Sequence, residues 1–207
     1  MNAQITVFVV DDDRAVRESL ALLVQSVGLE VETFAGAGEF LDAYRPDRLG
    51  CLITDIRMPG MSGLELQERL TEDGYHIPVI VLTGFGDVPA AVRALKGGAV
   101  DFVEKPFNPQ ALLDLVQQAL VRDTELREQA AREADLAERM ALLTPREREI
   151  MALVVAGKAN KVIAIDLSIS ERTVELHRGR IMKKMQARSV AELMRIVLPP
   201  GGDEIAK

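Results

Sequence analysis

Residues 51–60 read CLITDIRMPG, an apolar run that ends in Asp55 and a Met-Pro-Gly turn. Short apolar runs of this kind recur along the first half of the chain, and the segments between them have helical periodicity. The runs are Thr6 to Val10, Val31 to Phe34, Cys51 to Thr54, Val79 to Leu82 and Phe102 to Val103. Strands that are apolar on both faces and alternate with helices are typical of a parallel sheet covered on both sides. We therefore predict a doubly wound α/β domain with a five-stranded parallel sheet.

Polar side chains follow these strands at their carboxyl ends, where functional groups gather in such a sheet. Asp11 and Asp12 follow the first predicted strand, Asp55 ends the third, Thr83 ends the fourth and Lys105 follows the fifth. Crowded carboxylates repel one another unless a cation neutralises them, and hard oxygen ligands that leave room for a phosphate favour Mg²⁺. With the charge screened, Asp55 can attack phosphorus as a nucleophile while Lys105 and the Thr83 hydroxyl hold phosphate oxygens.

These residues resemble the receiver domain of bacterial two-component systems, over residues 5 to about 120. The resemblance rests on the acidic pair, on Thr54-Asp55-Ile56-Arg57-Met58-Pro59-Gly60, on Thr83 and on Lys105-Pro106. It implies a flavodoxin-like fold and phosphorylation of Asp55 by a sensor histidine kinase. It also implies that Asp12, Asp55 and the Arg57 backbone carbonyl bind Mg²⁺ directly, that Asp11 acts through water, and that the Lys105-Pro106 bond is cis. Asp13 is then left to start the first helix, where a negative charge suits the helix dipole.

The same resemblance implies how the phosphorylation signal leaves the site. Thr83 and Phe102 match the switch pair of the family, in which the hydroxyl moves toward the phosphate and the aromatic ring turns inward. Phe102 as an ordinary core residue is the alternative. The surface between Val88 and Phe107 matches the dimerisation face, so we expect a homodimer on phosphorylation, although a solvated surface would have the same composition.

Other interpretations explain part of this pattern. Asp11 and Asp13 satisfy the DxD motif of phosphatases of the haloacid dehalogenase type, but that class does not explain Asp55 with its turn or the basic C-terminal half. A degenerate receiver used only for interaction is disfavoured because Asp12, Asp55 and Lys105 are intact. In a purely structural interpretation, the first three aspartates cap a helix and Asp55 closes a turn. We predict that the protein is not an enzyme and assists only its own phosphorylation and dephosphorylation.

The second half of the chain differs from the first in charge. Residues 1–121 carry 9 basic and 18 acidic side chains, whereas residues 144–207 carry 12 and 8, so the latter segment is suited to nucleic acid. From Asn108 to about Met140 there is no Gly and, after Pro109, no Pro, which predicts one long helix; a flexible charged linker is the alternative. Thr144-Pro145-Arg146-Glu147 then predicts a capped helix start. We predict a receiver domain at 1–121, a linker helix at 122–141 and a second domain at 142–207.

The second domain has helix-turn-helix spacing. Lys161 to Leu167 predicts a short helix, Ser168 to Ser170 a turn, and Glu171 to Met185 a longer helix that Ser170 can cap. One face of the longer helix is expected to pack inward, and the opposite face can enter a major groove. The inward face holds Val174, Arg178 with its stem snorkelling outward, Ile181 and Met185. The opposite face holds Arg172, Glu175, Leu176, Gly179 and Lys183, and phosphate contacts are expected from Lys161, Arg180, Lys183 and Lys184.

Residues 142–198 resemble the LuxR-type domain of FixJ/NarL response regulators. The motifs are Thr144-Pro145-Arg146-Glu147-Arg148-Glu149, Asn160-Lys161, Thr173-Val174-Glu175-Leu176-His177-Arg178 and Ile181 to Met185. The resemblance implies an all-α four-helix domain that binds double-stranded DNA, with Glu175, Leu176 and Gly179 at base-facing positions, and it allows RNA polymerase as a partner. The candidate DNA-binding residues are Lys161, Arg172, Thr173, Glu175, Leu176, Arg178, Gly179, Arg180, Lys183 and Lys184. The sequence departs from the family at Arg180, where Asn or His is common, and at Gly179, because a glycine inside a helix costs roughly 1 kcal/mol relative to Ala.

Composition excludes several other classes. Cys51 is the only cysteine, so no intramolecular disulfide can form, and His76 and His177 lie too far apart in the sequence for the usual zinc-ligand spacings. The longest apolar runs, such as Ile77 to Leu82, are far shorter than the roughly 20 residues of a membrane span, and no membrane partner is expected. We expect a cytoplasmic, DNA-binding transcriptional regulator whose dimerisation and DNA binding are controlled by phosphoryl transfer from a sensor histidine kinase to Asp55.

Overall fold

The computed structural model describes residues 5–84 and 88–198, with the backbone alone at residues 88–91. The chain divides into two compact units between Glu128 and Gln129, and each unit is described separately. This division falls inside the range predicted for the linker helix. The outer ends of the two predicted domains, residues 1–4 and 199–207, lie outside the described residues.

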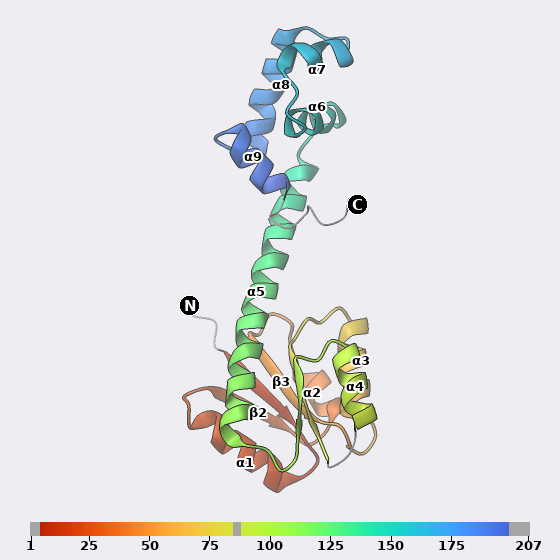
Figure 1. The fold of residues 1–207 in the computed structure, drawn as a ribbon, viewed down its shortest axis with the longest axis vertical. Coiled ribbons are helices and arrows are strands. Elements are labelled where there is room, and N and C mark those ends of the chain that lie inside the picture. Colours follow the sequence, from red (N-terminus) through yellow and green to blue (C-terminus); the bar gives the residue numbers. More distant parts are fainter. Residues whose placement is uncertain (1–4, 85–87, 199–207) are drawn as a thin grey trace. The chain divides into compact units, whose positions relative to one another are not determined.

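The first unit contains a five-stranded parallel sheet, as predicted (Figure 1). Its strands are β1 (Thr6–Val10), β2 (Glu30–Phe34), β3 (Gly50–Asp55), β4 (Val79–Thr83) and β5 (Asp101–Glu104), in the order β2-β1-β3-β4-β5. Every residue of β1, β3 and β4 is buried, because helices cover both faces of these central strands. The register pairs Val10 with Thr54 and Asp55 with Leu82, so the carboxyl ends of β1, β3 and β4 meet at one edge.

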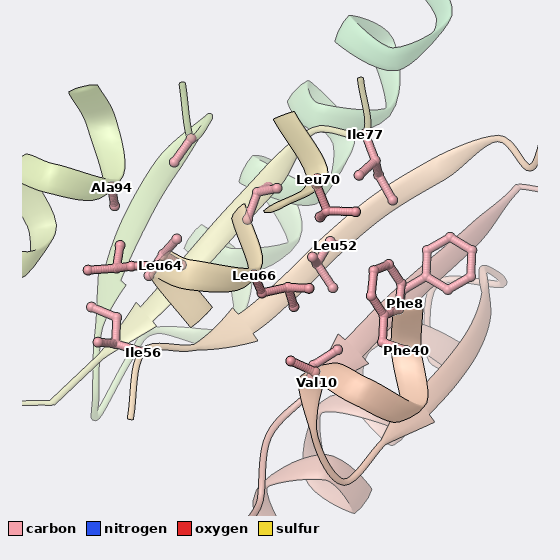
Figure 2. Packing of buried hydrophobic residues seen from close by; sticks show 14 of the residues in the cluster. Phe8, Val10, Phe40, Leu52, Ile56, Leu64, Leu66, Leu70, Ile77 and Ala94 are labelled. Atoms are coloured by element: carbon pink, nitrogen blue, oxygen red, sulfur yellow. The ribbon is translucent and has the colours of Figure 1, made fainter. Parts of the chain in front are cut away.

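Helices cover both faces of the sheet. They are α1 (Arg14–Gln25), α2 (Ala37–Ala43), α3 (Gly63–Glu72), α4 (Val88–Lys96) and α5 (Pro109–Ala141). Side chains of α2, α3 and α4 share one hydrophobic cluster with Phe8 and Leu52 of the sheet, and Figure 2 shows Phe40, Leu66 and Leu70 packed there. Residues of α1 and of the first three turns of α5 share a second cluster with the opposite side chains of the same strands. The alternation of side chains along each strand thus supplies two separate cores.

Hydrogen bonds attach helix α5 to the rest of the first unit beyond residue 121, where the linker was predicted to begin. The Asp123 carboxylate, 2% exposed, accepts from the Gly50 N–H at 2.9 Å and from Arg127 Nε at 2.9 and 3.0 Å. The Arg127 guanidinium also donates to the backbone carbonyls of Pro46 and Arg48 at 2.7 and 2.5 Å. The neighbouring Cys51 thiol is buried in the core, and this burial, aided by the Asp123 charge, raises its pKa to about 12.

The described part of the second unit, residues 129–198, is all helical, as predicted. It contains α6 (Pro145–Val155), α7 (Asn160–Asp166), α8 (Glu171–Lys184) and α9 (Val190–Val197), and the last turns of α5 join it through Leu136 and Met140. Thr144 and Glu147 form the predicted capping box of α6, and the Ser170 side chain caps α8. Within residues 5–84 and 88–198, no helix has the length and apolar character needed to cross a membrane.

Candidate functional site

Two buried carboxylates and one lysine converge at the carboxyl edge of the sheet. Lys105 Nζ donates to Asp55 Oδ1 at 2.5 Å and to Asp11 Oδ2 at 2.8 Å. Asp11 is 1% exposed and Asp55 is 9% exposed. Burial opposes the charge on Lys105, but the hydrogen bonds and charges of the two carboxylates outweigh it and raise the pKa of the ammonium above its ordinary value. The predicted residues that follow β1, end β3 and follow β5 are thus brought together.

The backbone around Asp55 holds its carboxylate in place. The Arg57 N–H donates to Asp55 Oδ2 at 2.7 Å, and Asp55 ends β3 beside Leu82 of β4. Gly63, at the start of α3, passes so close that a Cβ on it would lie 2.1 Å from the Asp55 carbonyl oxygen. Only glycine allows this approach, which turns the chain directly from the site into α3.

Asp12 and Asp13, the two aspartates that follow Asp11, have different surroundings. Asp12 is exposed, whereas Asp13 caps α1 by accepting from the Ala15 and Val16 N–H groups, as predicted for a residue that only starts the helix. Asp11 Oδ1 accepts from the Asp13 N–H at 2.9 Å. Sequence reasoning missed Arg17, whose Nη1 donates to the Asp11 carbonyl oxygen at 2.6 Å; a basic residue on the first turn of the helix was the only available signal.

The predicted switch residues lie on adjacent strands. Thr83 is buried and donates its hydroxyl proton to the Gly84 carbonyl oxygen at 3.1 Å, while the Lys105 N–H donates to the Thr83 carbonyl oxygen at 2.8 Å. Phe102 is 38% exposed, so its ring is not an ordinary core residue in this structure. The Lys105-Pro106 bond is cis, which confirms that expectation.

The donor chemistry at this edge fits Mg²⁺, because carboxylates and a backbone carbonyl are its preferred ligands. In the described part of the chain, no three His, Cys, Asp or Glu side chains are close enough together to enclose a metal ion as they stand. Asp11 and Asp55 are both paired with Lys105, whose single positive charge offsets only part of their negative charge. Asp12, Asp55 and the Arg57 carbonyl, with Asp11 acting through water, are the groups that would hold the ion beside Lys105.

Helices α7 and α8 carry the second group of predicted residues. Val174, Ile181 and Met185 of this segment are buried, as the helical pattern predicted, and Arg178 is half-buried. The opposite face of α8 is exposed throughout, as is Lys161 on α7. That exposed face consists of Arg172, Glu175, Leu176, Gly179, Arg180 and Lys183. Thr173 is half-buried and shares a hydrogen bond with the Ser170 hydroxyl at 2.8 Å.

Lys184 differs from the other predicted phosphate contacts. Its Nζ donates to Oε2 of Glu147 at 2.6 Å, and the Glu147 side chain is 3% exposed. The hydrogen bond from Lys184 and the N–H of Thr144 lower the pKa of Glu147 to about 2. The sequence signal for Glu147 was its place in the capping box, which gave no indication of a partner 37 residues away.

Replacing Glu147 by Gln is expected to destabilise the second unit by about 1–2 kcal/mol at pH 7, since the capping bond survives but the ion pair is lost. A lowered carboxyl pKa contributes stability that is present above the ordinary value of 4.5 and is lost as the pH falls toward 2, so the difference from wild type should shrink over that interval. Amide hydrogen exchange of α6 and α8 as a function of pH measures this difference in stability. The exposed Arg146–Glu149 pair provides the control, because Glu149→Gln should change stability by less than about 0.5 kcal/mol. A Glu147→Gln variant as stable as wild type at pH 7 would contradict the prediction.

The sequence defines the class of protein to which this fold and site belong. Residues 7–117 match the response regulator receiver domain, and residues 141–197 match the bacterial regulatory proteins of the luxR family. The chain belongs to the response regulators that join a receiver domain to a LuxR-type DNA-binding domain. It is accordingly a phosphorylation-activated transcriptional regulator and not a classical enzyme.

Several relatives share the whole arrangement. The chain is 50% identical to nodulation protein W of Bradyrhizobium diazoefficiens over 92% of its own length and 84% of that protein. It is 49% identical to the transcriptional regulatory protein FixJ of Azorhizobium caulinodans over 97% of this chain and 95% of that protein. Among solved structures it resembles the response regulator StyR, with 48% identity, a TM-score of 0.85 and coverage of 94% of this chain and 98% of that one.

Proposed function

We propose that Asp55 accepts a phosphoryl group from a sensor histidine kinase and that this modification controls dimerisation and DNA binding through α8. The observation that carries the proposal is the pair of buried carboxylates that share Lys105 at the carboxyl edge of the sheet. Such a site provides a nucleophilic oxygen, a second acidic group and a lysine ammonium within hydrogen-bond reach of one another.

In the proposed reaction, an Asp55 oxygen attacks phosphorus, the phosphorus–nitrogen bond of the phosphohistidine breaks, and its electron pair stays on the imidazole. The product on this chain is an acyl phosphate. Lys105 then donates to a phosphoryl oxygen instead of Asp55 Oδ1, and the Thr83 hydroxyl turns from the Gly84 carbonyl toward another. A Mg²⁺ ion held by Asp12, Asp55 and the Arg57 carbonyl, with Asp11 acting through water, would screen the carboxylates and hold phosphoryl oxygens. The same residues would support hydrolysis of the acyl phosphate by water.

The predicted dimerisation face has exposed apolar side chains that support a homodimer. Val92, Leu95 and Phe102 are exposed on α4 and β5, and burial of such side chains favours association. The side chains of residues 88–91, which belong to the same predicted face, lie outside the described residues. Inward rotation of Phe102 as Thr83 moves would alter this surface and link it to the phosphate.

DNA binding is proposed for the exposed face of α8 and for Lys161. Lys161, Arg180 and Lys183 supply the phosphate contacts. Arg172 lies on the face that enters the groove, where Glu175, Leu176 and Gly179 face the bases. Thr173 and Arg178 have a smaller share because both are half-buried, and Lys184 must leave Glu147 to reach a phosphate. We further propose RNA polymerase as a partner on DNA, a place in the cytoplasm, and a second functional domain that begins after residue 141. The first unit extends past the predicted boundary at residue 121 to Glu128.

The test is to incubate the full chain with acetyl phosphate and Mg²⁺ and to measure its intact mass, the masses of its proteolytic peptides, its oligomeric state and its DNA affinity. One phosphoryl adduct of about 80 Da on the peptide that contains Asp55 is expected, together with about tenfold tighter binding to a duplex selected from a random pool. An adduct on another peptide would contradict the assignment of Asp55. An adduct on Asp55 without any change in DNA affinity or oligomeric state would contradict control by phosphorylation.

A further inference from the structure

Gly179 occupies the middle of the exposed face of α8 without a structural reason for a glycine. It lies in a regular helix, and it does not belong to the glycines with positive φ. A Cβ built on Gly179 would meet no heavy atom of the described residues within 4 Å outside the backbone of its own helix. Alanine would therefore fit there, and because glycine is the poorer helix former by roughly 1 kcal/mol, the fold alone favours alanine.

The neighbours of Gly179 indicate what approaches it. Residues three and four positions apart lie side by side on a helix, so Leu176 and Lys183 flank Gly179 along the exposed face. Leu176 is 55% exposed, which leaves an apolar side chain on a strongly basic helix. Lys183 and Arg180, which are exposed near Gly179, add positive charge to the same part of the helix. An apolar contact beside cations suits the edge of a base pair in a major groove, where a thymine methyl group lies next to the phosphates.

We infer that Gly179 forms a notch in the DNA-reading face of α8 that admits the edge of a base pair to within contact of the helix backbone. The notch exists because Leu176 and Lys183 project on either side while Gly179 has no side chain. The glycine lowers the stability of the helix, but it allows the bases to approach the helix backbone more closely. Gly179 is then a specificity-determining residue. This inference rests on the proposed DNA binding by α8.

The test compares Gly179→Ala and Gly179→Leu with wild type in the full phosphorylated chain, using the duplex that wild type selects from a random pool. Gly179→Ala should raise the melting temperature of the second unit by about 2–6 °C and weaken binding to that duplex about tenfold, with a larger loss for Leu. The dependence of affinity on salt should not change, because the phosphate contacts remain. A second selection with the Ala variant should return a different base preference at the contacted positions.

Gly38 on α2 provides the matched control, since it is also an exposed helical glycine whose Cβ would meet nothing within 4 Å. Gly38→Ala should leave DNA affinity unchanged. The inference is overturned if both Gly179 variants bind within about twofold of wild type, or if Gly179→Ala lowers the melting temperature, which would reveal a structural need for the glycine. If wild type itself selects no DNA, the proposed function fails and the inference fails with it. If wild type selects DNA and both Gly179 variants bind it equally well, the inference alone fails.

Discussion

Replacing Asp55 by Asn is expected to abolish the phosphoryl adduct and, with it, the whole phosphate-dependent gain in DNA affinity. Asparagine has nearly the same shape, and its carbonyl oxygen can still accept from either the Arg57 N–H or Lys105. The amide lacks the nucleophilic carboxylate oxygen, so no acyl phosphate can form. The ratio of DNA affinities with and without acetyl phosphate should fall from about 10 in wild type to 1 in the variant.

Asp13→Asn provides the matched control for this experiment. Asp13 lies two residues from Asp11, but its side chain only caps α1, and asparagine is an equally good cap. This variant should gain the same mass as wild type and keep the affinity ratio. If Asp55→Asn still gains one phosphoryl group, another residue is the acceptor, and the role proposed for Asp55 must be abandoned.

Replacing Asp123 by Ala is expected to destabilise the first unit by about 3–5 kcal/mol. The substitution removes the acceptor of the Gly50 N–H and leaves the Arg127 guanidinium without its carboxylate. Removal of one partner of a buried ion pair costs this much because the remaining charge is desolvated and uncompensated. The melting temperature of this unit should fall by about 10 °C or more, as measured by circular dichroism of the full chain.

Asp114→Ala on the same helix provides the control, because Asp114 is exposed and accepts a side-chain hydrogen bond from the exposed Gln110. Its melting temperature should stay within about 2 °C of wild type. Asp123→Asn should lie between the two, since one oxygen can still accept from Gly50. A melting temperature for Asp123→Ala equal to that of the Asp114 variant would show that the buried pair does not fasten α5.

Most of the fold could be predicted because its signals are local. Apolar runs followed by helical periodicity predicted all five strands of the sheet, and Thr144 with Glu147 predicted the start of α6 through the capping box. The role of residues 122–128 could not be predicted in this way. Asp123 and Arg127 have the composition of a solvated linker, and only their contacts with the loop before β3 show that they belong to the first unit.

The candidate phosphorylation site was predictable because parallel strands deliver their carboxyl ends to one edge. That rule places Asp11, Asp55 and Lys105 together without knowledge of any distance. It could not predict that Lys105 pairs with both carboxylates in this structure or that the Phe102 ring is exposed. The choice between partners in a cluster depends on side-chain positions, which the sequence pattern does not contain.

The sequence by itself determined the doubly wound sheet, the capped helices and the types of residue at the two sites, because each follows from periodicity or from short-range hydrogen bonds. Only the tertiary structure decided which charges are paired across long separations. Lys184 is held by Glu147, Asp123 is buried against Gly50, and Gly179 has open space around it. Such pairings depend on how helices pack against one another, and packing is a property of the folded chain that no local stretch of residues specifies.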